Sequence, residues 1–159
     1  MKSYQQKWHQ NIPVSMAEAW KFFSSPLNLG KITPPNMKFI VTSDYDENTV
    51  MYPGMIITYK VSPLLNVKMN WVTEITHVQE PNFFVDDQRL GPFALWHHEH
   101  HFEEIPGGVH MTDILTYAVG YGPLGSIANM LMVKKRIADI FKYREKAVIE
   151  LFGEFKPVK

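Results

Sequence analysis

The stretch LWHHEHHFEE, residues 95–104, places four histidines around one glutamate, in a region whose apolar residues recur at every second position. Successive side chains of a β-strand point to opposite faces, so this stretch divides into two sets. One set combines aromatic rings with imidazoles: Trp96, His98, His100 and Phe102. The other set is wholly polar: His97, Glu99, His101 and Glu103. Because burying two acids with two histidines is costly, we expect the first set to point inward and the second to meet water.

The same two-residue period continues on both sides of this stretch. Short turn-like segments rich in Gly, Pro, Asn and Asp separate the apolar runs, and short links between successive strands predict hairpins in an antiparallel sheet. Near the N-terminus, Tyr4, Trp8 and Ile12 are compatible with a further strand. The other expected strands are residues 37–43, 54–62, 67–78, 83–90, 94–105 and 109–120.

Helical signals lie at the two ends of this strand region. Ser15 and Glu18 form the pattern of a capping box, which predicts a short helix from Met16 to Phe23. One or two more helical turns follow before Pro34 and Pro35 end them.

A long helix of about 28 residues is expected from the region of Pro123 to a stop at Gly153. Apolar residues recur through it at helical spacing: Ile127, Met130, Leu131, Ile137, Phe141, Val148 and Leu151. Basic residues lie among them, and we interpret these as a solvated face: Lys134, Lys135, Arg136, Lys142, Arg144 and Lys146.

Length and composition set the outer limits of function. The 159 residues suit one domain spanning residues 1–159. Sixteen basic and sixteen acidic residues give no net charge, which disfavours a nucleic-acid partner. The absence of cysteine excludes disulfides, thiolate catalysis and cysteine-bound metals. No apolar run reaches the roughly 20 residues of a membrane span, so we expect a cytoplasmic protein without stable membrane insertion.

The order of elements predicts an α+β fold with an internal hollow. A curved antiparallel sheet of about seven strands has an apolar concave face, and one long helix can cover that face without filling it. The space left between sheet and helix is the natural place for a ligand pocket.

Several strings carry a family resemblance: NLGKITPP (28–35), GPFALWHHEHHF (91–102), and TDILTYAVGYGPLG (112–125) followed by a helix that contains FKYR (141–144). With the order of elements, they make the chain similar to the START-like superfamily, in particular its bacterial ligand-binding branch. This helix-grip fold is shared with the major birch-pollen allergen and with polyketide cyclase/dehydratase-like proteins. The branch typically has a W-x-H-x-H-x-F strand and an Asp-x-x-x-Tyr strand, matched here by Trp96 to Phe102 and by Asp113 and Tyr117. The resemblance implies a cavity for a small, mostly apolar molecule.

Strand pairing predicts a belt of polar side chains on the concave face of this sheet. With a three-residue GPF turn, Asp86 lies opposite His98 and Gln88 opposite Trp96, and with a two- or four-residue IPGG turn His100 lies opposite Asp113. Met69 and Trp71 belong to another inward face. The predicted ligand-binding residues are Met69, Trp71, Asp86, Gln88, Trp96, His98, His100, Phe102, Asp113 and Tyr117.

The belt has four chemical interpretations. Asp113 and His100 can satisfy each other as buried groups, which is the favoured structural interpretation. The belt can also bind a polar group of a ligand whose remainder lies against apolar walls. A metal can be held by His98 and His100 with Asp86 or Asp113, but carboxylates paired with histidines more often orient them, so no metal and no cofactor is predicted. A buried His–Asp pair can also act in acid–base chemistry.

Three functions remain open on this basis. The favoured one is a non-enzymatic carrier or sensor of a small hydrophobic or amphipathic molecule. The alternative is a cyclase/dehydratase-type enzyme, in which His100 and Asp113 move a proton and Tyr117 polarises a carbonyl. The third is an interaction module whose apolar groove takes a protein segment or a lipid. The sequence shows no G-x-S-x-G nucleophile motif and leaves the oligomeric state open.

Overall fold

The computed structural model describes residues 2–46, 48–62, 67–120 and 122–157, with only the backbone of 122–131. Seven antiparallel strands form one sheet: β1 (Tyr4–Ile12), β2 (Ile40–Val41), β3 (Met55–Val61), β4 (Met69–Gln79), β5 (Phe83–Leu90), β6 (Phe93–Ile105) and β7 (Gly108–Val119). Their spatial order is β1-β7-β6-β5-β4-β3-β2. All links from β2 to β7 therefore join neighbouring strands, as the short turns predicted.

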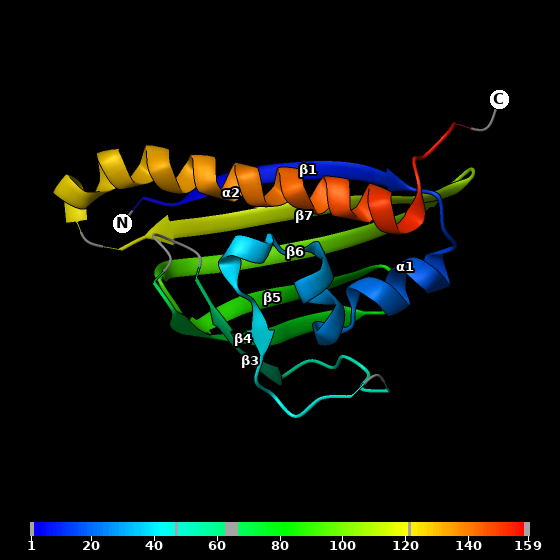
Figure 1. Cartoon of the computed structure of the whole chain (residues 1–159), viewed down its shortest axis with the longest axis horizontal. Coiled ribbons are helices and arrows are strands. Elements are labelled where there is room, and N and C mark those ends of the chain that lie inside the picture. Colours follow the sequence, from blue (N-terminus) through cyan, green and yellow to red (C-terminus); the bar gives the residue numbers. More distant parts are fainter. Residues whose placement is uncertain (1, 47, 63–66, 121, 158–159) are drawn as a thin grey trace.

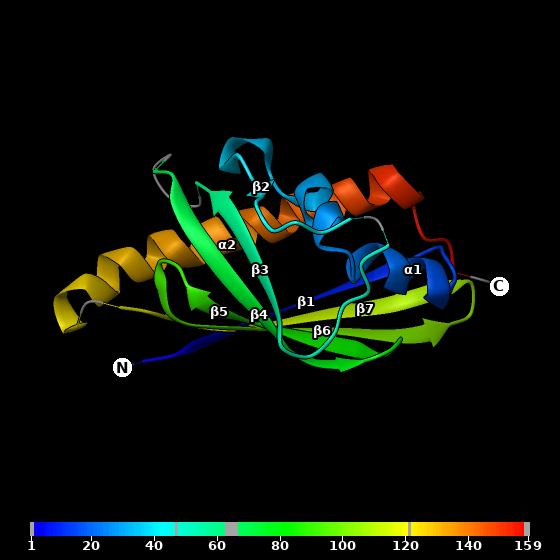
Figure 2. The ribbon, with the colours of Figure 1, turned by 90° about the horizontal axis from the view of Figure 1, so that it is seen from below.

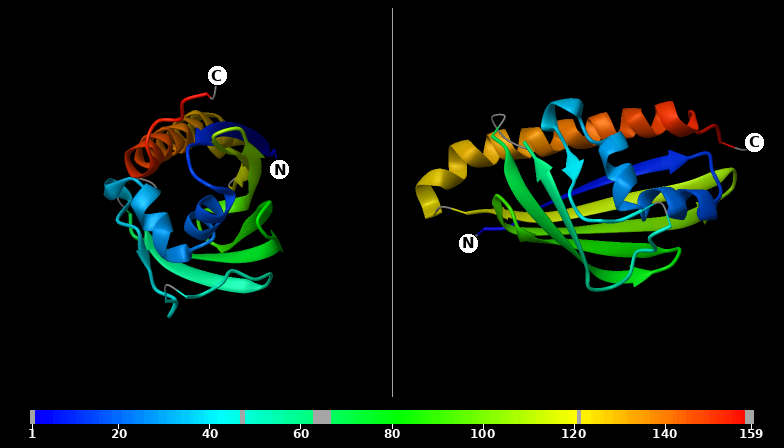
Figure 3. Two further views of the ribbon diagram at one scale, coloured as in Figure 1. Left: turned by 90° about the vertical axis from the view of Figure 1, so that its right-hand side faces the viewer. Right: turned by 60° about the horizontal axis from the view of Figure 1, so that its bottom comes forward.

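The sheet is strongly twisted and curved. Seen from below, β3 and β4 run at a steep angle to β1 and β7 (Figure 2). In the end-on view the sheet curls around an interior that α2 and the segment of short helices face (Figure 3). This is the α+β helix-grip arrangement that the sequence predicted.

Two turns in the middle of the chain fix the register of the strands around the histidines. Only Gly91 and Pro92 separate β5 from β6, and only Pro106 and Gly107 separate β6 from β7. Gly107 has a φ of 86°, a left-handed value that favours glycine at this turn. Asp86 pairs with His98 across β5 and β6, which is the expected register.

The prediction of a full strand over residues 37–43 is wrong. Only Ile40–Val41 forms a strand, because Pro35–Met37 makes a short 3-10 helix, η2, and Lys38 takes a left-handed backbone with a φ of 48°. The ring of proline fixes its φ near the helical value, which favours a helical turn at Pro35. The strand therefore begins at Ile40 and not at Met37, where the apolar pattern placed it.

The first helices follow the capping signals. Helix α1 spans Met16–Phe23, the predicted bounds, and its capping box is complete. The Ser15 hydroxyl oxygen accepts from the backbone N–H of Glu18 at 3.3 Å, and the Glu18 carboxylate accepts from the Ser15 N–H at 3.0 Å. A 3-10 helix, η1 (Pro26–Ile32), then brings the chain back across the concave side of the sheet.

Helix α2 covers the sheet and spans Gly122–Phe152. It runs along β1 and β7 for most of the length of the molecule (Figure 1). Gly153 follows it with a φ of 91° and donates its N–H to the carbonyl of Ile149 at 2.8 Å, so the predicted stop is confirmed. The side chains of Ile127, Met130 and Leu131 lie outside the described residues, and Leu151 is exposed.

The interior joins the inward faces of the sheet to α2. Near β1 and β7, Leu115 and Tyr117 pack against Val133, Ile137 and Phe141 of the helix. The Trp8 ring of β1 stacks on Phe141 with 3.6 Å between ring centroids. A larger apolar cluster surrounds α1, β3 and β4.

None of the helices, over the residues that the structure describes, has the length and apolarity that crossing a membrane requires.

Candidate functional site

A cavity of about 170 Å³ lies between the concave face of the sheet, α2 and the η1 segment. A single water needs roughly 10–15 Å³, so the cavity has room for a small organic molecule. Its sheet side is largely aromatic: Tyr59, Trp71, Phe84, Phe93 and Trp96. Helix α2 contributes Val133, Ile137, Ile140 and Phe141, and the η1 side contributes Leu29, Ile32, Met37 and Phe39.

Strand β6 divides its histidines between the two faces of the sheet as alternation predicted. His98 and His100 are each 5% exposed and line the cavity. His97 and His101 point to the convex side, where their side chains are about 40% exposed (37% and 41%). There His97 contacts Asp87 at 2.7 Å and His101 contacts Glu99 at 2.9 Å.

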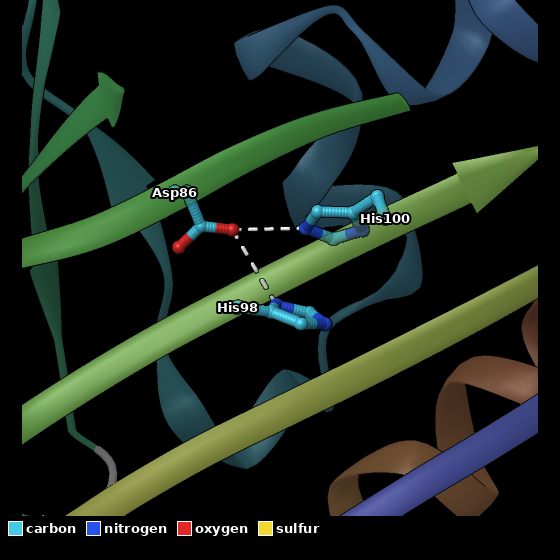
Figure 4. Close-up of side chains that lie close together, drawn as sticks. All are labelled: Asp86, His98 and His100. Atoms are coloured by element: carbon cyan, nitrogen blue, oxygen red, sulfur yellow. Dashed lines mark hydrogen bonds and ion pairs between the residues drawn. The ribbon is translucent and has the colours of Figure 1, made fainter. Parts of the chain in front are cut away.

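The two inward histidines meet two carboxylates. We name Asp86, His98, His100, Asp113 and Arg144 the His–Asp cluster. Asp86 Oδ2 lies 2.8 Å from His100 Nε2 and 3.4 Å from His98 Nδ1. Figure 4 shows both rings turning one nitrogen toward Asp86 and the other nitrogen away from it.

The second nitrogen of each ring meets the other carboxylate. Asp113 Oδ1 lies 3.0 Å from His98 Nε2 and 2.9 Å from His100 Nδ1. Two of the expected cross-strand pairs are present, with His98 opposite Asp86 and His100 opposite Asp113. The side-chain contacts go further than those pairs, because each imidazole bridges both carboxylates.

The electrostatics of the cluster favour ionised carboxyl groups. Burial by itself raises the pKa of Asp86, but hydrogen bonds from His100 and His98 outweigh it, and the pKa lies well below its usual range. Burial also raises the pKa of Asp113, whereas the Arg144 charge and the same two imidazoles lower it well below normal. Burial lowers the pKa of His98, yet its hydrogen bonds to Asp113 and Asp86 raise it overall.

Arg144 comes from α2, and the sequence interpretation of it as part of a solvated face is wrong. The side chain is buried, and its Nη2 lies 3.6 Å from Asp113 Oδ1 and 3.5 Å from His100 Nδ1. Its guanidinium also lies over the rings of Phe23 and Phe141. The signal was present in the helical period, because Arg144 is in step with Ile137, Phe141 and Val148 on the apolar stripe.

Of the other five basic residues of α2, one lines the cavity and four are exposed to solvent. Arg136 lines the cavity and donates to the Asn36 side chain at 3.3 Å. The four lysines of this helix are exposed, as a solvated face requires: Lys134, Lys135, Lys142 and Lys146.

Half of the predicted ligand-binding residues line the cavity: Trp71, Asp86, Trp96, His98 and His100. The other half lies elsewhere in the interior or at the strand ends: Met69, Gln88, Phe102, Asp113 and Tyr117. Asp113 is behind the imidazoles. The Tyr117 hydroxyl accepts from the Gln6 side chain at 3.3 Å. Phe102 packs edge-on against Trp20, and Gln88 binds the backbone of Phe93.

A second polar group lies on the cavity wall, and of its members only Trp71 was predicted from the sequence. The Tyr59 and Thr73 hydroxyls are hydrogen-bonded, and the Trp71 indole N–H donates to Thr73 Oγ1 at 3.1 Å. Burial, followed by the charge of Asp86, raises the pKa of Tyr59, so the phenol stays protonated. Tyr59, Trp71 and Thr73 share the inward alternation of paired strands β3 and β4, which is the signal that could have identified them together.

No known family model matches the sequence, and no curated protein sequence matches it. Solved structures do match the fold. A START superfamily protein from Mycobacterium smegmatis aligns over 93% of this chain and 96% of its own, with 12% identity and a TM-score of 0.69. The di-domain ARO/CYC protein BexL of the BE-7585A biosynthetic pathway aligns over 98% of this chain and 51% of its own, with 12% identity and a TM-score of 0.70.

A third match is Ara h 8.0201, over 94% of this chain and 99% of that protein, with 16% identity and a TM-score of 0.59. At identities this low, the three similarities establish the fold alone.

Proposed function

From the START-like helix-grip fold of this chain, we propose that it binds a small hydrophobic or amphipathic molecule between the sheet and α2, as a carrier or sensor. The observation that carries this proposal is the cavity of about 170 Å³, whose walls are aromatic and aliphatic apart from a few clustered polar groups. Burying the apolar part of a guest supplies most of the affinity in such a site, and a few polar groups fix its orientation.

The polar end of the guest is expected to lie at the His–Asp cluster. Asp86, His98 and His100 all line the cavity, and one oxygen of Asp86 points away from both imidazoles (Figure 4). That oxygen can accept a hydrogen bond from a hydroxyl or amine of a guest. Trp71 and Trp96 also line the cavity, with their ring centroids 5.2 Å apart in an edge-to-face arrangement, and offer flat surfaces to the apolar part of the guest.

An enzymatic function of the cyclase/dehydratase kind is the second candidate, and His100 between two carboxylates favours it. A histidine held in this way can move a proton. However, Tyr117 does not line the cavity and its hydroxyl already pairs with Gln6, so the structure does not favour the carbonyl-polarising role expected for it.

The carrier proposal can be tested with the fluorescent probe 1-anilinonaphthalene-8-sulfonate, measured in the presence of EDTA. Ile137→Trp fills the cavity from the helix side and should abolish saturable probe binding. Ile149→Trp is the matched control on the exposed face of the same helix and should bind as the wild type does. Equal probe binding by both folded variants would contradict a cavity site.

The variant His100→Gln distinguishes a carrier from an enzyme. For a carrier, any guest that co-purifies with the wild type, detected by native mass spectrometry, should bind the variant with altered affinity and be released unchanged. For an enzyme, a guest should be converted by the wild type and only bound by the variant.

A further inference from the structure

Three side chains at the polar end of the cavity present ligand atoms to one point. Asp86, His98 and His100 form a group in which one ligand atom from each lies within 4.8 Å of the others. All three line the cavity.

The far nitrogens of the two rings have a separate partner. His98 Nε2 and His100 Nδ1 both contact Asp113 Oδ1, on the side away from Asp86. A metal-bound histidine almost always donates its other N–H to a carboxylate or carbonyl, which fixes the ring orientation and leaves the near nitrogen with a lone pair. Asp113 is placed to do this for both rings at once.

A second carboxylate beside the two rings makes a metal site possible. A carboxylate paired with a histidine more often orients the ring than binds an ion. Here two carboxylates flank the same two rings from opposite sides. Asp113 orients them from behind, with Arg144 at 3.6 Å compensating its charge, and Asp86 remains on the cavity side.

We propose that Asp86 Oδ2, His98 Nδ1 and His100 Nε2 bind one divalent first-row transition-metal ion, whose remaining coordination positions face the cavity. Two imidazoles and one carboxylate form a donor set that suits Zn²⁺, Co²⁺ or Fe²⁺ and is less suited to Ca²⁺ or Mg²⁺. Binding releases any proton held between Asp86 and His98 Nδ1 or His100 Nε2, because both nitrogens must offer a lone pair to the ion. A donor atom of the guest, or water, completes the coordination.

The spacing of the ligand atoms is compatible with an ion. Ligand atoms about 2.0–2.2 Å from a metal ion lie roughly 3.0–3.5 Å from one another in octahedral or tetrahedral sites. Asp86 Oδ2 is 2.8 Å from His100 Nε2 and 3.4 Å from His98 Nδ1, and all three ligand atoms lie within 4.8 Å of one another, so side-chain rotation can bring them around one ion. Once both imidazoles are neutral, the two ionised carboxylates and the charged Arg144 leave one net negative charge on the cluster, which stabilises a bound cation.

The test titrates the EDTA-treated full chain with Co²⁺ and Zn²⁺ alone, by calorimetry and by the visible absorption of Co²⁺. We expect one ion per chain and a Co²⁺ spectrum with nitrogen and oxygen ligation. Asp86→Asn and His98→Gln should each abolish binding. Asp113→Asn should weaken it about 10- to 100-fold, because it acts through the imidazoles.

The convex side of β6 offers the matched control. His97→Gln combined with His101→Gln removes two imidazoles from the outer face of the same strand and should leave Co²⁺ binding unchanged. Loss of binding in this control, or unchanged binding in Asp86→Asn, would place the ion on the surface and overturn the proposal.

The wild-type titration decides the matter if a cluster variant does not fold. Absence of stoichiometric binding by the wild type would mean that the cluster is a self-contained ion network. The cavity proposal is tested separately, because probe binding is measured in EDTA. Metal binding without probe binding, or the reverse, tells the two apart.

Discussion

Arg144 of α2 lies 3.6 Å from Asp113 of β7, and both side chains are buried. This ion pair joins the covering helix to the sheet beside the cavity. The same guanidinium lies 5.6 Å from the ring centroid of Phe23 in α1, so one side chain links three elements. The orientation of the imidazoles thus depends on a residue about 30 positions after Asp113.

Replacing Arg144 by Met should destabilise the protein strongly, because it leaves the buried Asp113 charge without its cation. Removing one partner of a buried ion pair typically costs about 3–5 kcal/mol. Urea unfolding measures this, with Lys142→Met on the exposed side of the same helix as a control that should change stability by less than about 0.5 kcal/mol. Adding Asp113→Asn to Arg144→Met should recover part of the loss, and full additivity would argue against the pair.

The capping box of α1 should contribute to stability in a pH-dependent way. Ser15→Ala removes a helix cap and should cost about 1 kcal/mol at neutral pH. Hydrogen bonds from the Ser15 side chain and backbone lower the pKa of Glu18 below its ordinary 4.5. A lowered pKa in the folded state means that the contribution of Glu18 is complete above about pH 4.5 and declines as the pH falls through the folded-state pKa.

NMR titration of the Glu18 carboxyl group measures this effect directly. In Ser15→Ala the pKa of Glu18 should return toward its ordinary value, and the difference in stability between wild type and variant should narrow in acid. A difference that stays constant down to pH values below 3 would show that the Glu18 carboxylate plays no part in the cap.

Gly108 is required by a close approach between strands. A Cβ atom at this position would lie 2.1 Å from the carbonyl oxygen of Ile12, and the backbone cannot yield as a flexible side chain can. Gly108→Ala should therefore destabilise the β1–β7 end of the sheet, by about 1–3 kcal/mol as for other overpacked sites. Gly120→Ala is the control, because its nearest neighbour would be Ala94 Cβ at 3.9 Å.

Leu115 tests the packing between the sheet and α2 beside the cavity. It is fully buried against the helix, and Leu115→Ala should cost about 2–5 kcal/mol. Leu95→Ala on β6, which is 38% exposed, should cost much less. Similar losses in chemical denaturation would mean that the helix does not pack on β7 as the structure has it.

The inward placement of His98 and His100 could be predicted because alternation is a property of one strand. Trp96 and Phe102 flank them on the same face. The other face of the strand is wholly polar, and burying it instead would cost much more free energy. The pairing of His98 with Asp86 followed from short turns in the same way. The short strand at Ile40–Val41 was harder to place, since a 3-10 helix at Pro35 competes with the apolar pattern.

The sequence by itself determined the order of the elements, the antiparallel pairing and the inward faces, because these depend on local periods and short turns. Only the tertiary structure decided that Asp86 and Asp113 approach the imidazoles from opposite sides, that Arg144 joins them and that Tyr117 turns to Gln6. These relations depend on sheet curvature and on the rotation of α2 about its axis. Both are set by packing between residues far apart in the chain, which no local pattern encodes.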